Sequence, residues 1–259
     1  PFKNKGLWRI RPLNLFYWHL MGKLLPQSRK LITINGYKMQ LETTSIDGIE
    51  LLLIFSKEYE SVTTEVLKTY LKPNMTCVDV GANIGYFTLL MAKNCESVIA
   101  FEPEARNFRL LQHNIALNKF TNVEAKNTAV SDITGTRNLF TSSKESGEHS
   151  LVIKRHFKEA LPIEVVRLDD VIDKADVIKT DTEGNDFQVL RGAGRLLSTH
   201  PLLITEFWPE GIIKSGHTLQ EFWGMLRFYY PKIYIADEVE KTLTIGSLSE
   251  ALKRTSKNK

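Results

Sequence analysis

Two glycines and a carboxylate occur at spacings that suit an adenosine-containing cofactor. The segment 76–80, which is mostly apolar, predicts a buried strand, and the residues after it, from Gly81 to Gly85, predict a turn that opens a helix. The next apolar run, Ser97–Phe101, ends in Glu102. In an open α/β sheet, glycines after one strand let the backbone approach the ligand, and an acid after the next strand accepts hydrogen bonds from ribose hydroxyls.

The identity of that cofactor depends on two further residues. A dinucleotide site requires a middle glycine so that a pyrophosphate can approach the helix N-terminus, and Asn83 stands at that position. Asp79 would repel a pyrophosphate, but its charge suits the ammonium group of methionine. The pattern therefore favours S-adenosylmethionine, and a nicotinamide-dependent oxidoreductase on a similar sheet is the alternative. The predicted cofactor-binding residues in this part of the chain are Asp79, Gly81, Ala82, Asn83, Gly85, Glu102 and Pro103.

At these residues the chain resembles the FkbM family of S-adenosylmethionine-dependent methyltransferases. The resemblance covers roughly residues 58–210 and implies a class I methyltransferase fold and methyl transfer to a hydroxyl, often on a sugar or a polyketide-type product. Both neighbours of Asp181 are threonine, where the family usually has aliphatic residues. The matching segments are Val78 to Phe87, Phe101 to Pro103, Asn127 to Asp132, Leu168 to Asp170 and Ile178 to Gly184.

Further carboxylates follow the later predicted strands. Asp181 and Glu183 come after strand 176–180, at the sheet edge where α/β proteins bind ligands. We expect Asp181 to contact the cofactor, and either acid to accept the proton of an acceptor hydroxyl. The alternative for Asp181 is capping of the following helix, and the alternative for Glu183 is a favourable interaction with the dipole of that helix. His149, in a polar loop between two β-like runs, is a third candidate base, with simple solvation as its alternative.

Two other groups of residues complete the predicted site. Glu206 and Trp208 follow strand 201–207, and an acid beside an indole suits a sugar acceptor; a core Trp with a capping acid is the alternative. Ala129 and Val130 belong to the segment that the family resemblance places against adenine. No Cys or His cluster has the spacing of a zinc site, so we expect no metal.

Strands and helices alternate along most of the chain, which predicts a parallel sheet with right-handed crossovers. With the resemblance, this gives a class I (Rossmann-like) α/β fold: a mostly parallel seven-stranded sheet, helices on both faces, and an added N-terminal helix and β-hairpin. A hairpin of 233–235 and 242–245 would close the sheet. The remaining expected elements are strands 76–80, 97–101 and 122–127 and helices 58–71, 86–93, 104–118, 184–198 and 219–229.

We divide the chain into an N-terminal extension (1–57), a methyltransferase domain (58–250) and a frayed basic tail (251–259). The extension is expected to contain a helix from Pro12, a hairpin around Asn35-Gly36 and a strand over Ile49–Phe55. In the family the helix that follows borders the cofactor, so Glu58, Tyr59 and Glu60 are expected near its methionine end.

Charge is unevenly distributed along the 259 residues. The net charge is +4, but residues 1–30 hold seven basic residues and no acid, and residues 251–259 hold four and no acid, which leaves 34 − 11 = 23 basic against 30 acidic residues between them. An acidic body argues against nucleic-acid binding. The basic, aromatic segment 1–30 suggests peripheral contact with a membrane, and a helix that packs its apolar stripe on the domain or on a second subunit of a homodimer is the alternative. A non-catalytic membrane-tethered module is a second alternative function. Cys77 and Cys95 are expected as buried thiols, and the location as cytoplasmic or peripheral to the membrane.

Overall fold

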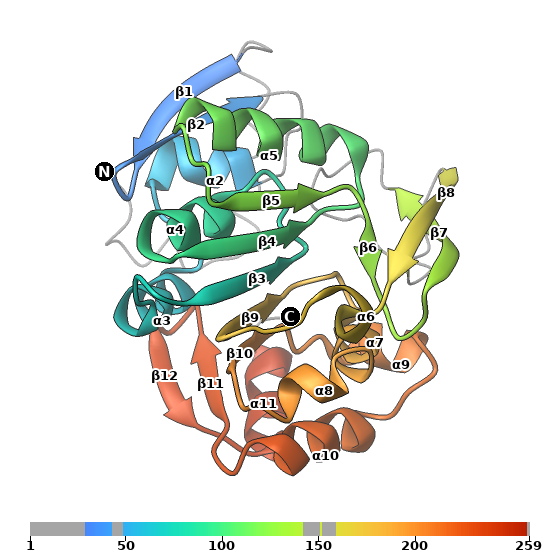
Figure 1. Ribbon diagram of the computed structural model, residues 1–259. Helices are drawn as coiled ribbons and strands as arrows, with labels where there is room; N and C mark the ends of the chain where they lie inside the picture. The colour runs from blue at the N-terminus through green and yellow to red at the C-terminus, as the bar shows by residue number, and fades with distance from the viewer. Residues whose placement is uncertain (1–28, 43–48, 142–150, 152–158, 258–259) are drawn as a thin grey trace.

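A computed structural model describes residues 29–42, 49–141, 151 and 159–257. Its centre is a five-stranded sheet in the order β10-β9-β3-β4-β5, in which all neighbours are parallel (Figure 1). This arrangement, with helices packed on the sheet, confirms the α/β class. The strands are β3 (Thr76–Val80), β4 (Ser97–Phe101), β5 (Val123–Lys126), β9 (Val177–Thr180) and β10 (Leu202–Thr205).

Each face of the sheet has its own hydrophobic cluster, because successive side chains of a strand point to opposite sides. Cys77 and Val98 belong to the cluster on one face, whose helices are α2 (Ile49–Ser56), α3 (Ser61–Tyr70), α4 (Tyr86–Asn94) and α5 (Ala105–Leu117). Val78 and Val80 belong to the other cluster, whose helices are α6 (Leu168–Val171), α7 (Asp186–Arg191), α8 (Gly194–Leu197), α9 (Pro209–Lys214) and α10 (Leu219–Tyr229).

The strand order has a switch point between β3 and β9. From β3 the chain moves outward through β4 to β5, and it later returns to place β9 and β10 on the other side of β3. The loops after β3 and β9 therefore diverge at the carboxyl edge of the sheet. In parallel α/β sheets such a divergence leaves a crevice in which ligands bind.

The predicted number of seven strands is not confirmed. Within the described residues the parallel sheet has five strands, and the C-terminal hairpin of β11 (Tyr234–Asp237) and β12 (Thr242–Ile245) pairs only with itself. A three-stranded sheet lies beyond the carboxyl ends of β3, β4 and β5 (Figure 1). It consists of β6 (Ala129–Val130), β8 (Glu159–Val166) and β7 (Gly135–Thr141).

The predicted N-terminal hairpin is present as β1 (Arg29–Ile34) and β2 (Tyr37–Glu42), with its turn at Asn35-Gly36. Helix α5 covers the free edge of β2. Asn114 Oδ1 accepts the N–H of Gln40 at 2.7 Å, and Asn118 Oδ1 accepts the N–H of Lys38 at 2.7 Å. These contacts attach the hairpin to the domain, while the predicted helix from Pro12 lies outside the described residues.

The expectation of a strand over Ile49–Phe55 was wrong, because this segment is helix α2. A short apolar run fits a buried strand or a helix equally well in sequence. Its folded environment shows helical spacing: Leu53 is fully buried, whereas Leu52 and Phe55 are exposed. Glu50 is buried as well, with its Oε1 3.2 Å from Arg106 Nη2 of α5.

Three differences concern the C-terminal half. The single helix expected over 184–198 is divided into α7 and α8, and a side chain at Gly192 would overlap the carbonyl oxygen of Ser131. A short helix after Trp208, α9 (Pro209–Lys214), was not expected. The supposedly frayed end forms α11 (Leu248–Lys257), whose Arg254 donates to Thr242 and Thr244 of β12. The domain boundaries drawn from the sequence remain a prediction.

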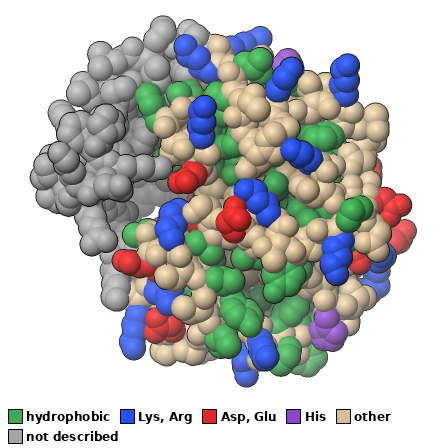
Figure 2. Space-filling model, turned by 90° about the vertical axis from the view of Figure 1, so that its left-hand side faces the viewer, with side chains coloured by type: hydrophobic (Ala, Val, Ile, Leu, Met, Phe, Trp, Pro, Cys, Tyr) green, Lys and Arg blue, Asp and Glu red, His purple; other side chains and the backbone are tan. Residues whose placement is uncertain are grey.

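The outer face of the β11–β12 hairpin is apolar. Tyr234 pairs with Ile245 and Ala236 with Leu243, and all four side chains are exposed. Figure 2, which faces the left-hand side of Figure 1, shows hydrophobic side chains gathered in its lower half. The expected homodimer remains a prediction. None of the described helices has the length and apolar character needed to span a bilayer.

Candidate cofactor pocket and acidic cluster

A pocket lies at the switch point, between the loops that follow β3 and β9. It extends from the segment before β6 to the loop after β9, so residues far apart in the chain share its wall. The lining residues are Val80, Gly81, Asn83, Phe101, Glu102, Pro103, Asn107, Thr128, Ala129, Val130, Leu139, Leu151, Asp181, Thr182, Glu183 and Asn185.

The turn after β3 has the close backbone approach that its glycines suggested. Gly81 has a φ of 79°, and a Cβ there would overlap the carbonyl oxygen of Asp181. The N–H groups of Gly81 and Ala82 both donate to the carbonyl of Phe101 at 3.0 Å. Asn83, with a φ of 50°, also adopts a left-handed conformation. Only a residue without a side chain lets the two loops meet at Gly81.

Glu102 is held by backbone groups on both sides. Its Oε2 accepts the N–H of Asn83 at 2.7 Å, and its Oε1 accepts the N–H of Glu104 at 2.9 Å. Burial raises the pKa of Glu102 to about 7, although these two N–H groups lower it. The carboxylate is thus fixed in the pocket wall, and its remaining lone pairs are available to the hydroxyl groups of a ribose.

The rest of this end of the pocket is apolar with a few amide groups. Phe101, Val130 and Leu139 are buried side chains in its wall, and Asn107 is also buried there. Asn185 donates from Nδ2 to the carbonyl of Val130 at 2.9 Å, which links the start of α7 to β6. Such a wall can cover the face of a flat base and offer polar groups to its edge.

The other end of the pocket is charged. Asp181 follows β9, is partly exposed, and has its Oδ2 3.5 Å from Lys179 Nζ. Lys179 is buried and its Nζ lies 4.7 Å from the centre of the Phe87 ring. Burial alone would lower the pKa of Lys179, but Asp181, Asp79 and Glu60 raise it above its usual value. Lys179 therefore keeps its charge beside several carboxylates.

These carboxylates are not all satisfied by the protein. Asp79 is fully buried; its Oδ2 accepts the hydroxyl of Thr88 at 2.6 Å, and its Oδ1 has no hydrogen-bond partner among the described residues. Burial raises the pKa of Asp79, and the positive charge of Lys179 opposes this rise. Buried acceptors without a partner are uncommon and call for an explanation. A cationic ligand fits this donor-poor, acid-rich end better than an anionic pyrophosphate does.

Two further acids lie next to the cluster. Asp186 Oδ1 accepts the hydroxyl of Thr180 at 2.7 Å, and burial raises its pKa to about 6. Burial also raises the pKa of Glu206 well above its usual value, and Asp181 adds to this effect. Glu206 Oε2 is buried without a hydrogen-bond partner among the described residues. No group of three or more His, Cys, Asp or Glu in the described part of the chain could hold a metal ion.

The structure brings most of the predicted site residues together. Ala82, Gly85 and Asp79 are not among the residues that line the pocket. His149 lies outside the described residues. The helix after Asp181 begins only at Asp186, so Asp181 is not its cap. The predicted residues that line the pocket are Gly81, Asn83, Glu102, Pro103, Ala129, Val130, Asp181 and Glu183.

The predicted acceptor-binding pair lies differently. Glu206 and Trp208 do not line the pocket, and the Trp208 ring packs against Gly184 and Gly211, where a side chain would overlap it. Lys214 Nζ lies 5.8 Å from the centre of the same ring. Sequence reasoning missed Thr128, Leu139, Leu151 and Asn185 of the lining, as well as Lys179. Thr128 and Lys179 each had a signal, because they lie inside the matching segments Asn127 to Asp132 and Ile178 to Gly184.

Comparison with known families identifies the class of this protein. A family model described as "Methyltransferase FkbM domain" matches residues 79–229, more than half of the chain. The chain belongs to the FkbM methyltransferase family, as the sequence motifs predicted, and its parallel α/β sheet is the one that family membership implies.

Two curated proteins are similar to the chain. It is 26% identical over 190 residues to "Methyltransferase sdnD" of Sordaria araneosa, covering 59% of this chain and 73% of that protein. It is 28% identical over 141 residues to "Methyltransferase 1" of Beauveria bassiana, covering 44% of this chain and 57% of that protein. Among solved structures, methyltransferase FkbM from Methylobacillus flagellatus KT is 17% identical with a TM-score of 0.37, covering 77% of this chain and 50% of that one. The chain thus spans about half the length of that structure.

Proposed function

We propose that this protein is an S-adenosylmethionine-dependent O-methyltransferase acting on a hydroxyl of a sugar, glycolipid or related natural product. The observation that carries the proposal is the contrast between the two ends of the pocket. Glu102 at one end is fixed where it can bind ribose hydroxyls, and a cluster of acids lies at the other end. A donor with a neutral nucleoside and a cationic sulfonium and ammonium fits this polarity. Membership in the FkbM family supports the same reading.

The place of each residue in the pocket indicates its proposed role. Glu102 would hold the ribose hydroxyls, Gly81 and Asn83 would lie along the donor, and Val130 would cover the base. When bound, the donor supplies a methyl group on a positively charged sulfur. An acceptor oxygen can attack the methyl carbon, with the sulfur leaving as a neutral thioether. Asp181 and Glu183 line the pocket at its charged end, where a carboxylate can accept the proton of the acceptor hydroxyl.

The acceptor rests on the family resemblance alone. Because Trp208 packs against two glycines, it offers no support for a sugar platform in the described conformation. Membrane contact through residues 1–30, a cytoplasmic location and the absence of nucleic acid among the partners likewise remain predictions from the sequence.

The proposal is tested first by binding. Isothermal titration should show affinity for S-adenosylmethionine and S-adenosylhomocysteine and none for NADH. Binding of NADH with no response to either methionine derivative would instead favour the oxidoreductase. Donor carrying a labelled methyl group should then be offered to panels of sugars, glycolipids and small hydroxylated products. Transfer of label to carbon or nitrogen rather than oxygen, located by mass spectrometry, would refute the O-methyl assignment.

A further inference from the structure

Two buried thiols lie in contact beside the strand that leads into the cofactor turn. The Cys77 thiol donates to Cys95 Sγ at 3.2 Å, and the two residues are 18 positions apart in the chain. Both are free thiols; Cys77 is fully buried and Cys95 is 8% exposed. They are the two cysteines of the sequence. The proposed function uses neither of them, although two thiols in contact are the arrangement from which a disulfide forms.

The sheet fixes the position of Cys77. This residue lies in β3, where it pairs with Val98 of β4 on one side and with Val177 of β9 on the other. Because both edges of β3 are hydrogen-bonded, the face to which the Cys77 side chain points is determined by the sheet. It points into the hydrophobic cluster that includes residues of α4, and Cys95 belongs to the same cluster.

The end of α4 fixes the position of Cys95. Cys95 is the C-cap residue of this helix, and its N–H donates to the carbonyl of Met91 at 2.9 Å. Its own carbonyl accepts Nδ2 of Asn122 at 2.9 Å. The next N–H, that of Glu96, donates to the carbonyl of Met75 just before β3 at 3.1 Å. The main chain therefore holds both thiols in place, and their contact does not depend on a mobile segment.

A bond between these sulfurs would close a ring that contains the cofactor turn. A disulfide places its two sulfurs about 2 Å apart, so the Sγ atoms need to approach each other by about 1 Å. The ring would consist of β3, the turn with Gly81, and α4, which packs beside β3 and β4 (Figure 1). Cys77 precedes Val80 and is not among the lining residues, so the bond would tie the ends of this strand–turn–helix unit without adding a group to the pocket.

The two thiols differ in reactivity. The hydrogen bond from Cys77 lowers the pKa of Cys95, although burial opposes this, whereas the same bond and burial raise the pKa of Cys77. Cys95 is also the thiol with some exposure to solvent. The thiolate is the form that attacks an oxidant, so Cys95 should react first and Cys77 second. An exposure of 8% admits a small oxidant more readily than a glutathione disulfide.

We propose that Cys77 and Cys95 form a reversible oxidation site, which hydrogen peroxide converts into a disulfide that fastens the strand–turn–helix unit of the cofactor pocket. Cys95 Sγ attacks one peroxide oxygen and the O–O bond breaks, which leaves a sulfenic acid on Cys95 and one molecule of water. Cys77 Sγ then attacks Cys95 Sγ and the S–O bond breaks, and the oxygen leaves with the thiol proton of Cys77 as a second water. The sulfurs lose two electrons and the peroxide gains them. The inference goes beyond the proposed function and does not depend on it.

The test counts thiols in the wild-type protein, which requires no variant. Folded protein is treated with hydrogen peroxide, the peroxide is removed, and the chain is unfolded in an alkylating agent for intact-mass measurement. The oxidised chain should lose the mass of two hydrogen atoms, take up no alkylating agent and run as a monomer on a non-reducing gel. Dithiothreitol should restore both thiols. With two cysteines in the sequence, the assignment of the bond is unambiguous.

Thermal unfolding and two reciprocal variants supply the second readout. Closing this ring constrains the unfolded chain, so the oxidised wild type should melt about 5–10 °C higher than the reduced protein. Cys77→Ala should stop at the sulfenic acid of Cys95, which dimedone traps, and Cys95→Ala should react with dimedone much less. Neither variant should gain melting temperature on treatment with peroxide.

Each outcome supports or refutes the oxidation site. Two thiols that still take up the alkylating agent after peroxide treatment would overturn it, as would a disulfide-linked dimer or oxidation that ends at a sulfinic acid. A lower melting temperature of the oxidised protein would overturn the fastening role. No readout involves a methyl donor, so these results leave the proposed function untouched, and failure of S-adenosylmethionine to bind would not affect them.

Discussion

The buried carboxylates near the two ends of the pocket differ in how completely the protein satisfies their hydrogen bonds. At the adenosine end, Glu102 has both oxygens bonded to backbone N–H groups. In the acidic cluster next to the charged end, Asp79 and Glu206 lie outside the pocket lining, and each keeps a buried oxygen without a hydrogen-bond partner among the described residues. A satisfied group fixes a binding surface before the ligand arrives, whereas an unsatisfied one is costly until a ligand completes it. The first end should therefore be rigid before the ligand binds, and binding at the second end should depend on the charge of the ligand.

The largest effect is expected where the two ends meet. Gly81→Ala places a methyl group against the carbonyl of Asp181 and imposes strain at a φ of 79°. We expect at least about 100-fold weaker binding of both S-adenosylmethionine and adenosine and a loss of roughly 2–4 kcal/mol in the free energy of unfolding. Titration calorimetry and urea denaturation would measure both.

Gly224→Ala in α10 is the matched control. No atom lies within 4 Å of its added Cβ, so it should be neutral or stabilise the protein by up to about 1 kcal/mol. If Gly81→Ala bound like wild type, the two loops would not need their close approach, and the division of the pocket into two ends would fail.

The next effect isolates the adenosine end. Glu102→Gln keeps the shape of the side chain, but its NH₂ group would face one of the two N–H groups that the carboxylate accepts. Leaving that donor unpaired costs roughly 1–3 kcal/mol, so affinity for adenosine and S-adenosylmethionine should fall together by about 10–100-fold. Exposed Glu124, paired with Lys126 at 3.0 Å, provides the control, and Glu124→Gln should change neither affinity. A loss of affinity for S-adenosylmethionine alone would show that Glu102 does not act at the adenosine end of the pocket.

The same contrast explains what the sequence could predict. The adenosine end is built mostly from neighbouring segments, so strand, glycine turn, helix and acid could be recognised in order from Gly81 to Glu102. The family motif extended this to Val130 and Asp181. The hairpin at Asn35-Gly36 was equally local, because its turn residues specify its geometry.

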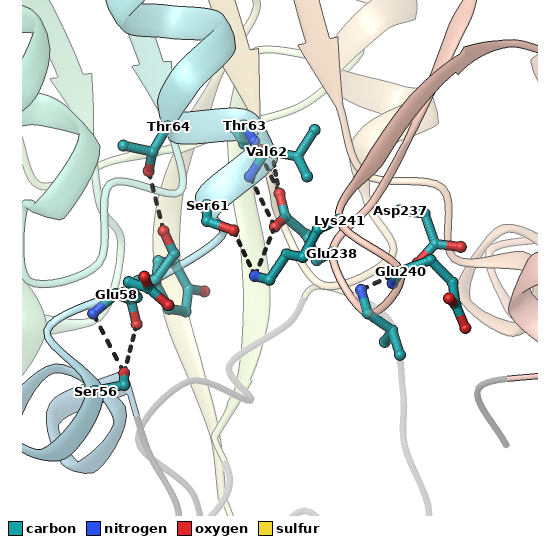
Figure 3. A network of polar contacts seen from close by, with 12 residues as sticks. Ser56, Glu58, Ser61, Val62, Thr63, Thr64, Asp237, Glu238, Glu240 and Lys241 are labelled. Atoms are coloured by element: carbon teal, nitrogen blue, oxygen red, sulfur yellow. Dashed lines mark hydrogen bonds and ion pairs between the residues drawn. The ribbon is translucent and has the colours of Figure 1, made fainter. Parts of the chain in front are cut away.

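The charged end could be predicted only in part. Asp181 and Glu206 were recognised as strand-end acids, but Lys179 among them was not, because its burial depends on Phe87 and on carboxylates from other strands. The capping of α3 by Glu238, from the turn between β11 and β12 (Figure 3), joins residues 176 positions apart, and no spacing in the sequence announces it. The strand wrongly expected over Ile49–Phe55 failed for the same reason, since the partners of Glu50 and Leu53 come from distant elements.

A smaller effect should reach the charged end from a distance. Glu238→Ala removes the acceptor for the first N–H groups of α3, so we expect a loss of about 1 kcal/mol in stability. Because Tyr59 and Glu60 directly precede α3, affinity for S-adenosylmethionine should fall a few-fold while that for adenosine does not change. Glu240→Ala, at an exposed position of the same turn, is the control. Unchanged binding in Glu238→Ala would show that the hairpin does not position the charged end.

The smallest effect concerns the pH dependence of the ligand-free protein. Burial raises the pKa of Glu60 from 4.5 to about 7 and that of Asp186 from 3.8 to about 6. A raised pKa means that the folded state binds the proton more tightly than the unfolded chain does. The resulting stability is fully present below the unfolded value and is lost as the pH rises through about 6 and 7.

The melting temperature without ligand should therefore fall by several degrees between about pH 5.5 and pH 8. Saturating S-adenosylmethionine should remove much of this fall, because its positive charge stabilises the ionised acids. Saturating adenosine should raise the melting temperatures at the two pH values equally. Differential scanning fluorimetry at both pH values would measure this. Glu102 has a raised pKa as well, of about 7, so a fall that adenosine also suppressed would assign the pH dependence to the adenosine end. A melting temperature that rose with pH would contradict the conclusion that the carboxylates near the charged end lack stabilising partners in the ligand-free protein.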